Sequence, residues 1–200
     1  MREKTGNRRG AGSGTEDDEQ VRGEGLPVVG IGASAGGLVA IERFLEGLPT
    51  DTGMAFVVVQ HLSPDHESGL VELLRGYTPL GVLQAEDGMT VEPNHIYVIP
   101  PDRQLTMAGG RLRVSERTGR EGMPVLIDEF FRSLAEQKGP LAACVILSGT
   151  GTDGSLGLRA IKQEGGFVLA QAESDADYGG MPQSAAQTGL VDVIAPGGEL

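Results

Sequence analysis

The 200 residues are enough for one domain with a sizeable core, and 28 acidic against 16 basic side chains give a formal net charge of −12 at pH 7. This charge argues against nucleic acid or an anionic membrane surface as a partner. No apolar run approaches the length of a membrane span, and the single cysteine, Cys144, indicates a reducing cytoplasm and excludes a disulfide framework.

The first 25 residues are polar and rich in glycine. They hold too few apolar side chains to bury a core. We therefore expect residues 1–25 to be a disordered tail and residues 26–200 to form one domain.

A strand, a glycine-dense turn and a helix are predicted from residue 26 onward. The run Pro27–Ile31 is rich in β-branched residues, and beyond the turn apolar residues recur at helical spacing, at Leu38, Ile41, Leu45 and Leu48. Ser34 lies at the crest of the turn, where its hydroxyl would be exposed beside the free N–H groups of a helix start. Ser34 is therefore the candidate nucleophile of a hydrolase.

The same turn admits other interpretations. Residues 30–35 (GIGASA) fit the dinucleotide-binding fingerprint, but the next strand ends in Gln60 and His61 where an acid should hold the ribose, and Asp51 lies before that strand. Residues 32–36 (GASAG) fit the nucleophile elbow of α/β-hydrolases, but those enzymes need a late histidine and none follows His95. A serine triad in another chain order remains open, as does a serine that merely caps the helix.

The remaining elements alternate between strands and helices. Strands are expected at 55–61, 79–84, 94–99, 141–147, 167–171 and 191–194, and a hairpin joins 104–107 to 111–114. Four helices are expected. One begins at 63–65 and faces the core with Leu70, Leu73 and Leu74, and another begins after residue 154 and faces the core with Leu156, Leu158 and Ile161. The other two lie at 127–137 and 183–187. Residues 117–123 are expected to be a mobile loop. This order predicts an α/β fold with a doubly wound, mostly parallel sheet flanked by helices and an antiparallel hairpin addition.

Three polar residues follow the carboxyl ends of predicted strands, where such sheets place their active sites. They are Ser34, His61 and Asp153. The other two histidines are less suitable as a base, because His66 lies near a helix start and His95 opens a strand. We expect His61 to take the proton of the serine hydroxyl and Asp153 to orient it.

Two features of this proposed triad depend on the turns. The N–H groups of Ala35 and Gly36 would face the developing oxyanion. The alternative for Asp153 is an N-cap of the helix that follows it. No metal cluster is visible, and we expect no cofactor.

Several motifs together resemble a known family. They are residues 32–37 (GASAGG), 60–61 (QH), 85–88 (AEDG), 99–101 (IPP), 146–154 (ILSGTGTDG) and 180–182 (GMP). In this order they are similar to the catalytic domain of the chemotaxis protein-glutamate methylesterases of the CheB type, over residues 26 to 195. The resemblance implies the triad Ser34, His61 and Asp153 and a largely parallel sheet.

The resemblance also implies a substrate. Family members hydrolyse glutamate γ-methyl esters on the cytoplasmic helices of chemoreceptors, release methanol, and often deamidate receptor glutamine. Many members have methionine at the position of Thr150, which we group with Ala35 and Gly36 as an oxyanion or substrate-binding residue. This difference and a tail too short for a receiver domain are features more similar to those of proteins that fuse the esterase to a receptor methyltransferase. A receptor methyltransferase domain is therefore a second expected partner. The alternative to an esterase is a binding module that keeps the fold without turnover.

Overall fold

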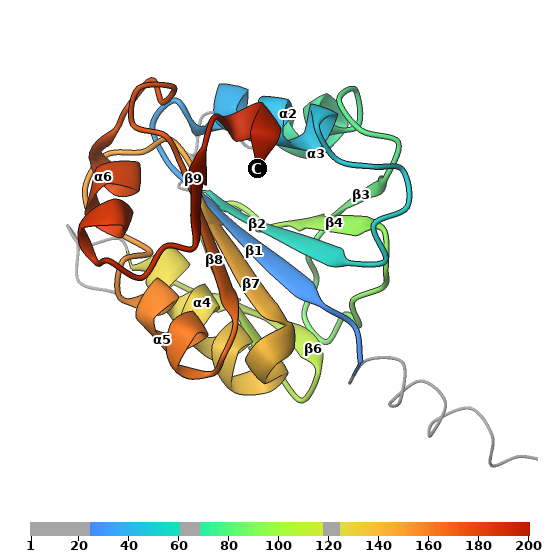
Figure 1. Ribbon diagram of the computed structural model, residues 1–200. Helices are drawn as coiled ribbons and strands as arrows, with labels where there is room; N and C mark the ends of the chain where they lie inside the picture. Colours follow the sequence, from blue (N-terminus) through green and yellow to red (C-terminus); the bar gives the residue numbers. More distant parts are fainter. Residues whose placement is uncertain (1–24, 61–68, 118–124) are drawn as a thin grey trace, which may run out of the picture.

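A seven-stranded parallel sheet forms the centre of the computed structural model, which describes residues 25–60, 69–117 and 125–200 (Figure 1). Its strands lie in the order β3-β4-β2-β1-β7-β8-β9. They are β1 (Val28–Ala33), β2 (Ala55–Gln60), β3 (Gly81–Gln84), β4 (His95–Val98), β7 (Ala142–Ile146), β8 (Phe167–Gln171) and β9 (Val193–Ala195). The predicted doubly wound parallel sheet is therefore confirmed, with β1 between β2 and β7.

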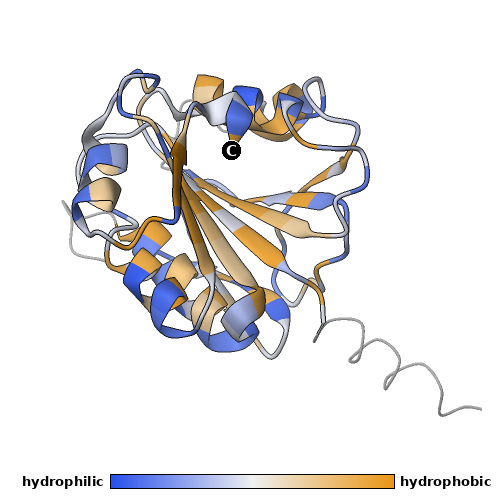
Figure 2. Ribbon diagram, viewed as in Figure 1, coloured by the Kyte–Doolittle hydropathy of each residue, from blue (hydrophilic) through white to orange (hydrophobic). Residues whose placement is uncertain are grey.

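Helices cover both faces of this sheet (Figure 1). One face carries α2 (Gly37–Glu46) and α3 (Leu70–Leu74), and the other carries α4 (Leu126–Lys138) and α5 (Gly157–Gln163). The helix α6 (Gly180–Gln187) and the 3-10 turns η2 (Gly139–Leu141) and η3 (Gly197–Glu199) complete the fold. Figure 2 shows that the strands are mostly hydrophobic, as expected for strands buried on both faces.

The predicted hairpin forms a second, two-stranded antiparallel sheet. It joins β5 (Arg103–Ala108) to β6 (Arg111–Glu116) through Gly109 and Gly110, which both have positive φ angles. The N–H of Met107 donates a hydrogen bond of 2.9 Å to the Ser133 hydroxyl. This bond fixes the hairpin against the middle of α4.

Two predicted core positions are wrong. Leu73 is 40% exposed because α3 spans five residues, of which only Leu70 and Leu74 face the core. Leu156 is 64% exposed because it precedes the first helical residue of α5.

Some expectations fall outside the part of the chain that the structure describes. These are the tail (except Gly25), the helix start at 63–65 and almost all of the loop at 117–123. No helix within the described ranges is both long enough and apolar enough to cross a membrane.

Candidate active site

Ser34 lies on the turn between the end of β1 and the start of α2. Its N–H donates to the carbonyl oxygen of Ser148 at 3.0 Å, and its own carbonyl accepts from the N–H of Gly37 at 2.8 Å. The N-cap residue of α2 is Gly36, and the Ser34 hydroxyl makes no hydrogen bond to any described residue. The interpretation of Ser34 as a helix cap is therefore wrong, and its side chain is left for another role.

Gly36 is the position where this turn needs glycine. Its φ angle is +66°, in the left-handed region that bulkier residues avoid. A Cβ at Gly36 would also lie 2.8 Å from the Asp177 Cβ and 2.9 Å from the Tyr178 ring. The Tyr178 side chain therefore packs on the turn at Gly36, two residues after Ser34, and its half-exposed ring forms a wall at this end of the turn.

A fully buried serine that the sequence did not single out, Ser148, holds this turn in place. Its hydroxyl donates to the carbonyl of Ala35 at 2.9 Å and accepts from the N–H of Tyr178 at 3.0 Å. Its N–H donates to the side-chain oxygen of Gln171 at 2.8 Å. Ser148 thus joins the turn at Ser34 to β8 and to the segment before α6.

The next residue, Gly149, allows close packing against Ser34. A Cβ at Gly149 would lie 3.0 Å from the Cβ of Ser34 and would overlap the Met181 sulfur. The carbonyl of Gly149 accepts from the Met181 N–H at 2.9 Å. Thr150, one residue further, is exposed on the same loop, so the third residue of the predicted oxyanion or substrate-binding group lies at the surface near Ser34.

Asp153 lies at the far end of this loop and is buried. Its carboxylate accepts three main-chain hydrogen bonds, from the N–H groups of Ile127 at 3.1 Å, Asp128 at 3.0 Å and Gly154 at 2.9 Å. Two of these donors belong to the first turn of α4. Asp153 therefore does cap a helix, but not the one that follows it in the chain.

The two described candidate triad residues share the carboxyl edge of the sheet. Ile127, which donates to Asp153, also packs on the end of β1, since a Cβ at Gly32 would lie 2.5 Å from its Cγ2. Ser34 therefore lies against the start of the loop that follows β7, and Asp153 lies at the far end of the same loop. His61 lies outside the described residues; it follows Gln60, the last residue of β2, which pairs with Ala33 in β1.

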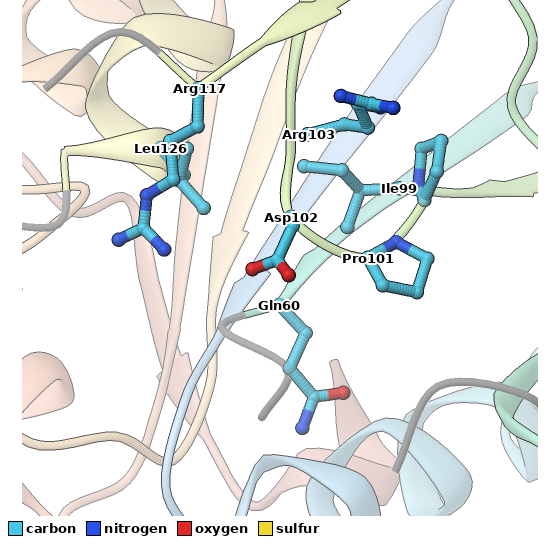
Figure 3. Close-up of a pocket in the computed structure, with 8 residues that line it drawn as sticks. Gln60, Ile99, Pro101, Asp102, Arg103, Arg117 and Leu126 are labelled. Carbon is cyan, nitrogen blue, oxygen red and sulfur yellow. The ribbon is translucent and has the colours of Figure 1, made fainter. Parts of the chain in front are cut away.

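A small pocket of about 100 Å³ adjoins this site on the side of β4. It is lined by Gln60, Ile99, Pro100, Pro101, Asp102, Arg103, Arg117 and Leu126. Figure 3 shows the Asp102 carboxylate pointing toward Gln60, whereas the Arg103 guanidinium points away. The pocket offers charged and amide groups beside the strand end that precedes His61.

Comparison with known proteins identifies the family to which this chain is similar. The family model for the CheB methylesterase matches residues 29–200. A protein-glutamate methylesterase/protein-glutamine glutaminase 1 of Myxococcus xanthus is 36% identical over 184 residues, which cover 90% of this chain and 53% of that protein. A relative from Rhizobium meliloti, named for the group 3 operon, is 36% identical over 172 residues, 86% of this chain and 49% of its own length.

A solved structure shows the same fold. The CheB methylesterase catalytic domain of Thermotoga maritima superimposes with a TM-score of 0.78 at 30% sequence identity. The match covers 87% of this chain and 94% of that one. By contrast, this chain spans about half the length of the curated relatives it matches.

Proposed function

This chain belongs to the CheB methylesterase family, and we propose that it is a serine hydrolase that removes methyl groups from glutamate γ-methyl esters of chemoreceptors. The same site would deamidate receptor glutamine, since the relatives are named for both activities. The proposed triad is Ser34, His61 and Asp153.

One observation supports this proposal above the others. Ser34 presents a hydroxyl without a structural partner among the described residues, on a turn that Ser148 holds rigidly, at the same sheet edge as the buried carboxylate of Asp153. A purely structural serine in such a turn would be expected to cap α2, and it does not. The arrangement is that of a positioned nucleophile.

The first half of the reaction follows from these positions. His61 would accept the Ser34 proton as the hydroxyl oxygen attacks the ester carbonyl. The negative charge that forms on the carbonyl oxygen would be held by the N–H groups of Ala35 and Gly36, which donate to no described residue. Thr150, exposed on the neighbouring loop, would contact the substrate from the opposite side.

The second half releases the products. His61 would return the proton to the departing methoxide, which leaves as methanol, or to the departing amide nitrogen, which leaves as ammonia. Water then cleaves the acyl-enzyme to give glutamate. Asp153 has acceptor positions for about four hydrogen bonds, so its three main-chain bonds are compatible with a further bond to an imidazole.

The partners are part of this proposal. We expect methylated receptor helices to dock over Ser34 in the cytoplasm, between the wall formed by Tyr178 and the pocket beside Gln60. A receptor methyltransferase domain is the second expected partner, because Thr150 replaces a methionine of many family members. Neither nucleic acid nor membrane insertion has a place in this function.

Methanol release from a methylated receptor tests the proposal directly. The chain should release methanol, and its Ser34→Ala variant should not. A fluorophosphonate should label the folded chain at a single site, which peptide mapping should place at Ser34. A folded chain that neither labels nor releases methanol would instead be a binding module.

A further inference from the structure

A second buried acid, Asp128, lies beside Asp153, and the segments that carry the two acids donate hydrogen bonds to each other's carboxylates. We propose that Asp128, in the first turn of α4, is a positioning residue of the active site, whose carboxylate holds the segment that carries Asp153. This inference rests on the proposed function, because it assigns Asp128 to the site built on Ser34 and Asp153.

The hydrogen bonds between the two segments are reciprocal. Asp153 lies in the loop before α5 and accepts a hydrogen bond of 3.0 Å from the N–H of Asp128, which lies at the start of α4. Asp128 in turn accepts from the N–H groups of Leu156 at 2.9 Å and Gly157 at 2.7 Å, at the start of α5. Neither helix is capped by the side chain of its own N-cap residue. Each is capped by the carboxylate of the other segment.

Both carboxylates of these reciprocal caps are buried. Asp128 is 4% exposed and Asp153 is 8% exposed. Burial raises the pKa of Asp128, its bonds from Gly157 and Leu156 oppose that rise, and the charge of Asp153 adds to it. Carboxylates withdrawn from water need hydrogen-bond donors, and each of these two takes donors from the segment that carries the other.

The packing around the pair leaves little room for Asp153 to move. A Cβ at Gly157 would lie 2.9 Å from the Asp128 carbonyl oxygen and 2.6 Å from the Phe131 Cβ, so α4 and α5 approach each other at backbone distance. The neighbouring Ile127 packs against Gly32, two residues before Ser34. The start of α4 therefore connects the strand that leads to the nucleophile with the carboxylate that would orient its base.

Loss of the Asp128 side chain should loosen this connection. The part-buried N–H of Leu156 and the buried N–H of Gly157 would lose their acceptor, and the segment that follows Asp153 would shift to find another. Asp153 would then hold His61 less well at the moment of proton transfer, whereas the surface that binds the receptor would be unchanged. The expected signature is a lower kcat with little change in KM.

The experiment compares Asp128→Ala, Asp128→Asn and the control Glu129→Ala, an adjacent and less buried acid of α4. Methanol release from methylated receptor is measured well below each melting temperature, together with the labelling rate of Ser34. We expect Asp128→Ala to lower kcat about tenfold or more with KM changed less than about twofold. Asp128→Asn keeps the acceptor and should restore kcat to within about threefold of the wild type, and Glu129→Ala should match the wild type.

The outcomes separate the two claims. An active wild-type chain with an equally active Asp128→Ala variant would overturn the positioning role alone, as would an Asn variant no better than Ala. If Asp128→Ala does not fold, Asp128→Leu, whose side chain is similar in length and also lacks an acceptor, replaces it, and a folded leucine variant with wild-type kcat would contradict the role. A wild-type chain without methanol release or labelling would overturn the proposed function and this inference together.

Discussion

The contact between Gly149 and Ser34 makes a sharp test of the candidate site. In Gly149→Ala the new methyl group would lie 3.0 Å from the Ser34 Cβ, where ordinary van der Waals contacts lie at 3.4–4 Å. It would also overlap the sulfur of Met181, whose side chain is 1% exposed and has little room to turn away. Ser34 must therefore move by a few tenths of an ångström.

The magnitude follows from these contacts. Displacement of a reacting group by 1 Å costs about 10²-fold in rate, so we expect Gly149→Ala to lower kcat and the labelling rate of Ser34 by about tenfold. Overpacking of this kind should lower the free energy of unfolding by about 1–3 kcal/mol. Fluorophosphonate labelling measures the first effect and denaturant unfolding the second.

The matched control is Gly151→Ala, two residues along the same loop. There a Cβ would meet nothing within 4 Å, although the φ angle of +84° strains any side chain. This variant should lose about 1 kcal/mol or more of stability and yet label at nearly the wild-type rate. Wild-type labelling in folded Gly149→Ala, or equal losses in the two variants, would refute the reasoning.

Three further predictions concern the ionisable residues. Asp153→Asn should lower kcat about 10⁴-fold. Because the substitution weakens the cap of α4, it should also lower the free energy of unfolding by about 1–2 kcal/mol. A rate loss below about tenfold would leave only the capping role. His61→Ala should abolish methanol release while His95→Ala retains most of it, and wild-type activity should fall as the pH drops through the usual histidine range near 6.5; equal losses would contradict the assignment of the base. Asp175 has a lowered pKa because it accepts from the Gly197 N–H and the Gln171 amide, so Asp175→Asn should be less stable than the wild type by about 1 kcal/mol at pH 7. Because the pKa of Asp175 is lowered in the folded state, its contribution is complete above the unfolded value near 4 and is lost as the pH falls through the lowered folded value. The stability difference should therefore shrink progressively below about pH 4, and a constant difference in urea titrations would refute the prediction.

The sequence predicts the sheet, the turn at Ser34 and the hairpin because each depends on local pattern. A β-branched run before a glycine turn, or a Gly-Gly pair between alternating segments, specifies its structure within a few residues. The same local logic fails for Leu156, whose spacing fits a helical stripe but which precedes the helix. Pattern indicates which residues belong to an element only where the ends of that element are clear.

The supports of the candidate site could not be predicted in this way. Asp128 is an acid in the first turn of a helix, a common position that carries no signal of a partner 28 residues away. Ser148 is one small residue in a glycine-rich loop, and its contact with Ala35 spans 113 positions of the chain. The alternative interpretation of Asp153, as an N-cap, points to the wrong helix for the same reason. Only the packing of α4 against α5 brings the N–H donors of α4 within reach of Asp153.

The candidate site also sets when activity can appear during refolding. The turn at Ser34 leads into the helical layer with α2, whereas Asp153 is held by the opposite layer, with α4 and α5. Each layer closes its own hydrophobic cluster on its own face of the sheet. An intermediate with only one docked layer would contain half of the catalytic apparatus, and the contacts that join the halves are long-range and slow to form. Recovery of the proposed esterase activity should therefore follow the last kinetic phase, which would make labelling of Ser34 a reporter of complete assembly and not of early collapse.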